Sequence, residues 1–187
     1  MPGCQWVYKS ALSWGKIHYM ILIAIGANLP AGDGALPLTT CEEAVRAVCT
    51  IPGMTLVAQS TWYRSQAIPV SSQPDYCNGV IRMAGGIEPH RLLQALQAIE
   101  ARFGRVRSVP NAARTLDLDI IDIDGLLHAT PDLLLPHPRA HERAFVLYPL
   151  TDVAPDWRHP TLDQSAAALL AGLPPQKIKP WHDTAAW

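Results

Sequence analysis

The sequence has little of what marks exported, disulfide-stabilised or nucleic-acid-binding proteins. Its 187 residues include only four cysteines, which form no Cys-x-x-Cys pair, so we expect a reduced, cytoplasmic protein without a disulfide framework. Lys and Arg number 15 against 16 Asp and Glu, and this net charge of −1 disfavours binding to nucleic acid through its phosphates. Hydrophobic residues make up 49% of the chain, which predicts a single packed domain.

Long hydrophobic runs are also missing. The longest run, Tyr19–Ile25, has seven residues, whereas a membrane-spanning helix needs about 20, so we expect no membrane partner. Lys9 and Lys16 upstream leave a signal peptide as an alternative, but an isoleucine-rich run favours a buried strand. We therefore expect an N-terminal extension over 1–19, flexible or non-native, a single domain over 20–172 and a C-terminal tail over 173–187.

Hydrophobic periodicity and turn residues predict alternating strands and helices. The clearest helix begins near Pro89, carries apolar residues at i, i+4, i+7 and i+11, and stops at Gly104. The other predicted elements are a strand over 20–25, a helix over 41–50 capped by Thr40, and strands over 54–64, 76–83 and 116–123. This order predicts an α/β (α+β) fold with a ferredoxin-like βαββαβ core and an antiparallel sheet. C-terminal additions follow: a loop over 131–138, an apolar segment over 145–150 and a short helix near 162–171.

Charged residues are scarce but concentrated in one stretch. Four arginines fall within 13 residues, and four aspartates follow within eight: Arg102, Arg105, Arg107 and Arg114, then Asp117, Asp119, Asp122 and Asp124. Asp117 and Asp119 lie two apart on a predicted strand, so both point to one face. Paired carboxylates with nearby arginines suit Mg²⁺ and a nucleotide phosphate chain. The alternative is a structural network in which the arginines only neutralise the aspartates.

Other nucleotide and metal motifs are missing. The chain has no P-loop motif and no His-Glu-x-x-His pair. His137 and His141 are four apart, but Pro138 lies between them and no third ligand is apparent, so we expect no zinc site. Asp122 and Asp124 have the opposite parity along the strand from Asp117 and Asp119 and adjoin the predicted turn, so we expect them to be strand-end and turn residues.

The segment Arg114–Ile120, with the sequence RTLDLDI, resembles the signature of the 6-hydroxymethyl-7,8-dihydropterin pyrophosphokinase family. Further segments resemble that family in the same order: 23–29, 63–65, 73–78, 104–107 and 135–150. The resemblance covers roughly residues 20–160. It implies a ferredoxin-like fold and a Mg-dependent diphosphotransferase in folate biosynthesis. It also implies ATP and 6-hydroxymethyl-7,8-dihydropterin as substrates, neither nucleic acid nor membrane as partner, and a monomer.

The resemblance also implies site residues. Asp117 and Asp119 would hold two Mg²⁺ ions, and Arg105 and Arg114 would be catalytic. The expected ATP-binding residues are Gln97, Glu100, Arg107, Ile120, His137 and Arg143. The expected pterin-binding residues are Ser65, Ala67, Ile68, Tyr76, Asn78 and Phe145.

The sequence departs from the family pattern at several places. The loop over 108–113, which contains Asn111, lacks a Trp-Gly-Pro, and Gln66-Ala67 replaces a Pro-Pro. Asp132 stands where the family often has a second triphosphate-binding arginine, and Leu134 replaces a nearby threonine. Two competing hypotheses remain, a non-catalytic ferredoxin-like module that binds a small molecule or RNA, and a degenerate enzyme. The intact aspartate pair and loop arginines argue against the second.

Overall fold

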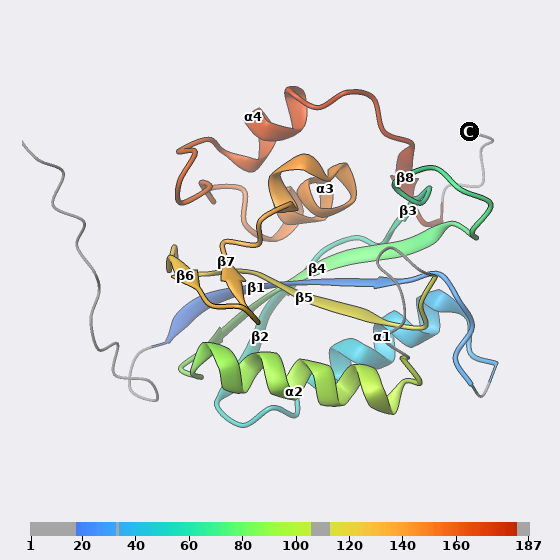
Figure 1. Cartoon of the computed structure of the whole chain (residues 1–187), viewed down its shortest axis with the longest axis horizontal. Helices are drawn as coiled ribbons and strands as arrows, with labels where there is room; N and C mark the ends of the chain where they lie inside the picture. The colour runs from blue at the N-terminus through green and yellow to red at the C-terminus, as the bar shows by residue number, and fades with distance from the viewer. Residues whose placement is uncertain (1–17, 33, 106–112, 183–187) are drawn as a thin grey trace, which may run out of the picture.

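The computed structural model describes residues 18–32, 34–105 and 113–182, which form a sheet covered by helices on both faces (Figure 1). The main strands are β1 Tyr19–Ala27, β2 Met54–Gln59, β3 Tyr63–Ser65, β4 Tyr76–Gly85, β5 Asp117–Ile123 and β8 Ile178–Pro180. The α-helices are α1 Pro37–Val48, α2 Pro89–Arg102, α3 Ala144–Val153 and α4 Ala166–Ala171. A small hairpin, β6 His128–Ala129 with β7 Leu134–Leu135, and a 3-10 helix, η1 Ala140–Glu142, connect β5 to α3.

The sheet has the predicted ferredoxin-like topology. Its strand order is β5-β1-β4-β3-β8, with β2 also paired to β4, and these neighbouring pairs are antiparallel. Helices α1 and α2 cover one face, and α3 and α4 cover the other (Figure 1). The central strand β1 therefore lies between two layers of helices, with both faces away from water.

The sequence of β1 suits this central position. Ile21, Ile23 and Ile25 are buried on the α1/α2 face, whereas Leu22 is buried among the α3/α4 residues. A strand buried on both faces is apolar along its whole length, because neither set of alternate side chains meets solvent. The isoleucine-rich run is thus the middle of the core.

Two predicted boundaries are wrong. Helix α1 begins at Pro37, after the N-cap Leu36, and Thr40 is a buried residue inside the helix rather than its cap. Proline fits the first helical turn, where its fixed φ is helical and its missing N–H needs no partner. The strand predicted over 54–64 is split into β2 and β3, because Ser60 Oγ accepts a hydrogen bond from Val80 N and Trp62 turns inward.

A bulge near the end of β5 explains the buried Asp122. Ile23 pairs with Ile120 and Leu22 with Asp122, so Ile121 is the extra residue. The Asp122 carboxylate accepts hydrogen bonds of 3.1 Å from Trp157 Nε1 and from Gly125 N. Asp122 therefore ties the strand end and the following turn to the α3/α4 layer, and its role is structural.

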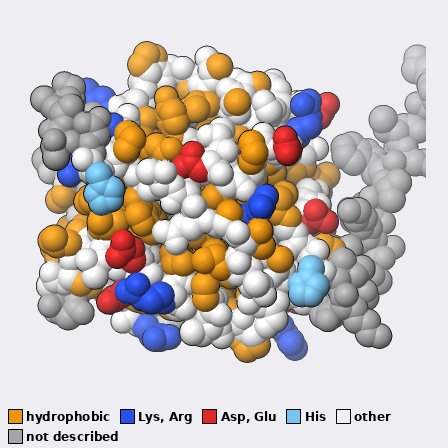
Figure 2. Space-filling model, turned by 180° about the vertical axis from the view of Figure 1, so that it is seen from behind, with side chains coloured by type: hydrophobic (Ala, Val, Ile, Leu, Met, Phe, Trp, Pro, Cys, Tyr) orange, Lys and Arg blue, Asp and Glu red, His pale blue; other side chains and the backbone are white. Residues whose placement is uncertain are grey.

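The C-terminal segment joins the sheet. Strand β8 pairs with β3 and extends the edge, so part of the predicted tail over 173–187 belongs to the sheet. The side of the molecule opposite to the view in Figure 1 carries hydrophobic side chains mixed with scattered basic, acidic and histidine side chains (Figure 2). Within the described ranges, no helix is both long and apolar enough to cross a bilayer.

Candidate active site

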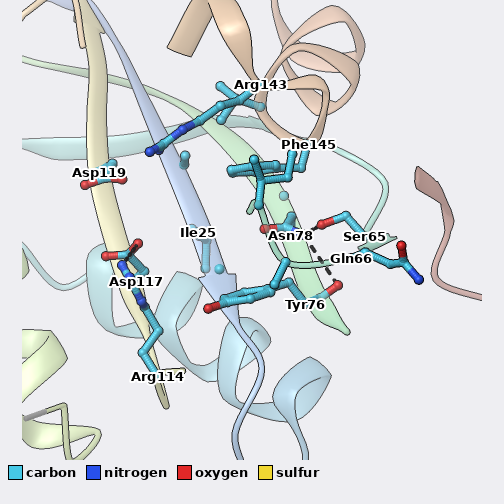
Figure 3. A pocket seen from close by; sticks show the side chains of 16 residues that line it. Ile25, Ser65, Gln66, Tyr76, Asn78, Arg114, Asp117, Asp119, Arg143 and Phe145 are labelled. Atoms are coloured by element: carbon cyan, nitrogen blue, oxygen red, sulfur yellow. Dashed lines mark hydrogen bonds and ion pairs between the residues drawn. The ribbon is translucent and has the colours of Figure 1, made fainter. Parts of the chain in front are cut away.

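A cleft with about 690 Å³ of empty space opens between the sheet and the start of α3. Its walls come from β1, β4, β5, the segment after β3, and α3 with the residue before it (Figure 3). The lining residues are Ala24, Ile25, Gly26, Ser65, Gln66, Ala67, Ile68, Tyr76, Asn78, Gly79, Arg114, Asp117, Asp119, Arg143, Phe145 and Val146. The cleft thus brings together the predicted aspartates, Arg114, Arg143 and all six residues predicted to bind the pterin.

Asp117 and Asp119 lie on the same face of β5 and both line the cleft, as their spacing predicts (Figure 3). Burial, together with the charge of Asp117, raises the pKa of Asp119 to about 7. The Asp119 side chain still keeps 38% of its surface exposed to the cleft. The charged form of Asp119 is therefore disfavoured without ligands, and the carboxylate remains accessible to a cation in the cleft.

Asp117 differs from Asp119 because two arginines contact it. Arg114 Nη1 lies 2.5 Å from Asp117 Oδ2, and Arg105 Nη1 lies 2.5 Å from Asp117 Oδ1. Desolvation opposes the charged form of Arg114, but Asp117 and other nearby acceptors outweigh it and raise the pKa of Arg114. A structural network of the kind left open by the sequence thus exists, and Asp117 is the aspartate that both arginines contact.

Glu100 links α2 to the start of β5. Its side chain is buried, accepts a 2.8 Å hydrogen bond from Leu118 N, and forms an ion pair with Arg105. The carboxylate therefore holds Arg105 and β5 at a fixed distance from α2. A contact between Glu100 and ATP stays a prediction.

Asn28 connects two walls of the cleft and was not predicted as a site residue. Its Oδ1 accepts a 2.8 Å hydrogen bond from Arg114 N, and its Nδ2 donates to Pro74 O at 3.1 Å and to Gln73 Oε1 at 3.3 Å. The backbone of Asn28 also donates to Arg114 O at 3.1 Å. These long-range contacts show that the buried Asn28 amide fixes the start of β5.

Aromatic rings line the other end of the cleft. The rings of Tyr76 and Phe145 both border the cavity, with Asn78 between and behind them (Figure 3). Asn78 Nδ2 donates a 2.9 Å hydrogen bond to Ser65 Oγ, which fixes the plane of the amide. Two rings and an oriented amide suit a planar heterocycle with hydrogen-bonding edges.

Gly26 lets β1 pass close to this amide. A Cβ atom at position 26 would lie 3.2 Å from Asn78 Oδ1. A glycine inside a strand often marks a place where another group approaches the backbone closely. That general signal could have suggested Gly26 from the sequence.

The predicted ATP-binding residues are spread around the carboxylate end. Arg143 reaches from the start of α3 toward Asp119 (Figure 3), and His137 Nε2 lies 3.8 Å from Asp119 Oδ2. Burial and the charge of Arg143 lower the pKa of His137 to about 4, so its imidazole is neutral at pH 7. Ile120 is buried on the opposite face of β5 from the two aspartates, and Gln97 lies on α2. Arg107 lies outside the described residues, as does Asn111.

The residues present fit a hard cation. Mg²⁺ takes oxygen ligands and is commonly held by one or two carboxylates together with substrate phosphates. Asp117 and Asp119 supply two carboxylates on one face, and a bound cation would oppose the desolvation and the Asp117 charge that raise the pKa of Asp119. Within the described ranges, no group of three or more His, Cys, Asp and Glu side chains could hold a metal without such a substrate.

Comparison with known proteins identifies relatives over most of the chain. A model of the 7,8-dihydro-6-hydroxymethylpterin-pyrophosphokinase (HPPK) family matches residues 22–155. The chain is 40% identical over 159 residues to the 2-amino-4-hydroxy-6-hydroxymethyldihydropteridine pyrophosphokinase of Pseudomonas aeruginosa, covering 85% of this chain and 94% of the relative. It is 38% identical over 146 residues to the protein of the same name from Synechocystis, covering 78% of this chain and 74% of the relative.

Solved structures share the fold. The structure of Plasmodium falciparum HPPK-DHPS with pterin and p-hydroxybenzoate superposes with a TM-score of 0.64 at 12% sequence identity. The match covers 82% of this chain and 43% of that chain, so this chain spans less than half of the solved protein. At this identity the likeness concerns the fold alone.

Proposed function

The chain belongs to the 7,8-dihydro-6-hydroxymethylpterin-pyrophosphokinase family, and on that ground we propose how its cleft performs the reaction. The protein is a diphosphokinase of folate biosynthesis. It transfers a diphosphate group from ATP to the hydroxymethyl group of 6-hydroxymethyl-7,8-dihydropterin, and the products are AMP and the pterin diphosphate. One observation carries the assignment of the site: a single cleft joins paired carboxylates to an aromatic pocket with an oriented amide.

The aromatic end would bind the pterin. Tyr76 and Phe145 would contact its ring faces, and Asn78, held by Ser65, would hydrogen-bond to its edge. The backbone of Ser65, Ala67 and Ile68 would close the same wall. The hydroxymethyl group would then point along the cleft toward the carboxylates, where the phosphates of ATP bind.

The carboxylate end would bind the triphosphate with Mg²⁺. Asp117 and Asp119 would hold two Mg²⁺ ions, which when bound would neutralise phosphate charge and make the β-phosphorus more electrophilic. Arg105, Arg114 and Arg143 lie around these carboxylates and would contact phosphate oxygens. His137 is neutral, so it would donate a hydrogen bond without adding charge. Gln97, Glu100, Arg107 and Ile120 remain the proposed residues on the nucleotide side.

The chemical step would be an in-line attack by the substrate hydroxyl on the β-phosphorus. AMP is the leaving group, and the guanidinium groups of Arg105 and Arg114 would stabilise the charge that moves onto its bridging oxygen. Positioning and charge neutralisation dominate such reactions, so no residue need act as a strong base. The family match and the named relatives favour the catalytic function over the non-catalytic alternative.

We also propose a cytoplasmic monomer that binds neither nucleic acid nor membranes. The charge balance and the cysteine content support this, since Cys41, Cys49 and Cys77 are all free. The domain limits of 20–172 are proposed with one amendment, because the strand over 178–180 completes the sheet.

Product analysis tests the proposed function. The protein is incubated with Mg-ATP and 6-hydroxymethyl-7,8-dihydropterin, and nucleotides are separated by chromatography. Diphosphate transfer gives AMP in amounts equal to the pterin diphosphate, whereas simple phosphoryl transfer gives ADP. Formation of ADP, or no nucleotide turnover that depends on the pterin, would refute the proposal.

A further inference from the structure

The C-terminal segment over 174–181 connects two walls of the aromatic end of the cleft. On one side, β8 pairs with β3, Lys177 O accepts a hydrogen bond of 3.4 Å from Gln66 N, and Trp181 N donates to Trp62 O at 2.8 Å. The Arg64 guanidinium lies 4.9 Å from the centre of the Trp181 ring. These contacts attach the segment to the strand that carries Ser65 and leads into Ala67 and Ile68.

On its other side the segment contacts the start of α3 through one side chain. Gln176 Oε1 accepts a 2.9 Å hydrogen bond from Ala144 N, and Gln176 Nε2 donates a 3.1 Å hydrogen bond to Glu142 O. Both partners are backbone groups, on either side of Arg143. One glutamine amide therefore fixes the backbone that leads into the helix.

Helix α3 needs this contact because its own N-cap residue cannot supply one. The N-cap is Arg143, whose guanidinium has no acceptor atom and makes no capping hydrogen bond to the helix. The first N–H groups of a helix lack partners within the helix, and a side-chain oxygen normally accepts from one of them. Gln176, 33 positions after the N-cap, takes over this role for Ala144.

The two neighbours of the capped Ala144 enter the cleft. Arg143 and Phe145 both line it, and the Arg143 guanidinium lies 5.5 Å from the centre of the Phe145 ring. A shift of the backbone at 142–144 would change the direction of both side chains together. Pro174 and Pro175 precede Gln176 and restrict the backbone of the segment, so the amide is presented with little conformational freedom.

We propose that Gln176 is a positioning residue for the aromatic end of the cleft, where the pterin would bind. By capping α3 from the C-terminal segment it fixes Phe145 opposite the Ser65–Ile68 wall, so that the segment is needed for binding the pterin as well as for completing the sheet. This inference rests on the proposed function, in which Phe145 contacts the pterin. Arg143 lies between the two backbone groups that Gln176 contacts, so nucleotide binding would weaken as well. The effect should be smaller than on the pterin, because Arg105 and Arg114 contact Asp117 at the other end of the cleft.

Titration of two variants tests the proposal. Gln176→Ala removes the cap, and Gln94→Ala is the matched control because Gln94 is exposed on α2, away from the cleft. Each protein is saturated with Mg²⁺ and α,β-methylene-ATP, whose Pα–Pβ link cannot be cleaved, and is then titrated calorimetrically with 6-hydroxymethyl-7,8-dihydropterin. We expect the pterin Kd to rise roughly five- to tenfold in Gln176→Ala alone, corresponding to the loss of a helix cap. We expect the Kd of the nucleotide analogue to rise by a clearly smaller factor, because Arg143 is only one of the three arginines proposed to contact the phosphates.

A conservative variant and a structural measurement complete the test. Gln176→Glu keeps an oxygen that accepts from Ala144 N and places a negative charge at a helix N-terminus, but it loses the donor to Glu142 O, so it should restore part of the pterin affinity. Amide hydrogen exchange at Ala144 should be faster in Gln176→Ala than in Gln94→Ala, and this comparison needs no turnover. The exchange rate therefore shows whether Gln176 caps Ala144 even if the protein does not transfer diphosphate. Equal exchange at Ala144, or an equal weakening of pterin and nucleotide binding with a lowered Tm, would overturn the proposal.

Discussion

The Arg114 guanidinium lies 2.5 Å from one carboxylate oxygen of Asp117, and Arg105 lies 2.5 Å from the other oxygen. Asp119, two residues along the same strand, has the His137 imidazole 3.8 Å away, and this ring is neutral at pH 7 and so forms no ion pair. The two carboxylates proposed to share metal ions are thus electrostatically unequal without ligands. This difference gives separate expectations for the two aspartates and for Arg114.

The substitution Asp119→Asn should lower activity and raise stability. The pKa of Asp119 is raised to about 7, so in wild type the stability linked to this group is present below its unfolded pKa near 4 and is lost as the pH rises toward 7. The asparagine variant has no charge to bury, and its substrate-free Tm at pH 8 should equal or exceed that of wild type. Turnover should fall by about 10² or more, since even outer partners of a metal site contribute 10- to 100-fold.

Asp124→Asn is the control for this pair of measurements. Asp124 is exposed in a turn with a φ of 48°, a conformation that asparagine adopts readily, so both its Tm and its activity should match wild type. Near-normal turnover of Asp119→Asn at low Mg²⁺ would contradict the metal assignment.

Arg114→Ala should reduce kcat more than it weakens substrate binding. A guanidinium that contacts the leaving phosphate more strongly in the transition state contributes mainly to kcat, and loss of one such donor typically costs about 10²–10³ in rate. The backbone of Arg114 stays attached to Asn28 through both its N–H and its C=O, and Arg105 continues to neutralise Asp117. The variant should therefore remain folded.

Single-turnover kinetics and thermal melting separate this role from a structural one. Arg91→Ala, on the exposed side of α2, is the control for loss of an arginine. If Arg114→Ala melted at a lower temperature with an unchanged single-turnover rate, its partnership with Asp117 would be structural alone.

The sequence was most informative where a signal is local. The period of two in β5 places both aspartates on one face, and the periodic residues of α2 end at Gly104, as predicted. Strand β1 and the order of the six core elements also follow from local patterns. These features depend on residues a few positions apart, which a sequence displays directly.

Contacts between distant residues could not be predicted in the same way. Thr40 follows a proline that starts the helix earlier, so its capping potential is not used. The bulge at Ile121 depends on the pairing with β1, and the role of Asn28 depends on a residue 86 positions away. The aspartates were found because they form a local motif, whereas Asn28 and Gln176 act only through the tertiary structure.

Asn28→Ala should destabilise the protein and disturb both ends of the cleft. It leaves the N–H of Arg114 and the carbonyl of Pro74 without their present partner in a buried place, and each such loss costs about 1–3 kcal/mol. Urea unfolding should show the reduced free energy of unfolding. Asn28→Asp retains an acceptor for Arg114 N but loses the donor, so its loss should be smaller. Equal stability of Asn28→Ala and wild type would contradict the linking role.

Gly26→Ala should weaken pterin binding while leaving the fold and nucleotide binding intact. The new Cβ would lie 3.2 Å from Asn78 Oδ1, tighter than ordinary contact, and Ser65 Oγ holds the same amide from its nitrogen side at 2.9 Å. The amide must therefore tilt, and its edge no longer matches the pterin. We expect about a tenfold rise in the pterin Kd, which corresponds to about 1.4 kcal/mol.

The thermal stability of Gly26→Ala should rise slightly or remain unchanged. Gly26 lies in β1 with an ordinary negative or extended φ, and replacing such a glycine by alanine restricts the unfolded chain. Gly32→Ala is the matched control, because a Cβ at position 32 meets nothing within 4 Å. A Gly26→Ala protein that binds the pterin as tightly as Gly32→Ala would show that the Asn78 amide does not set the pterin site. A weaker pterin complex with an unchanged Tm and an unchanged nucleotide Kd would place the recognition of the pterin edge at Asn78.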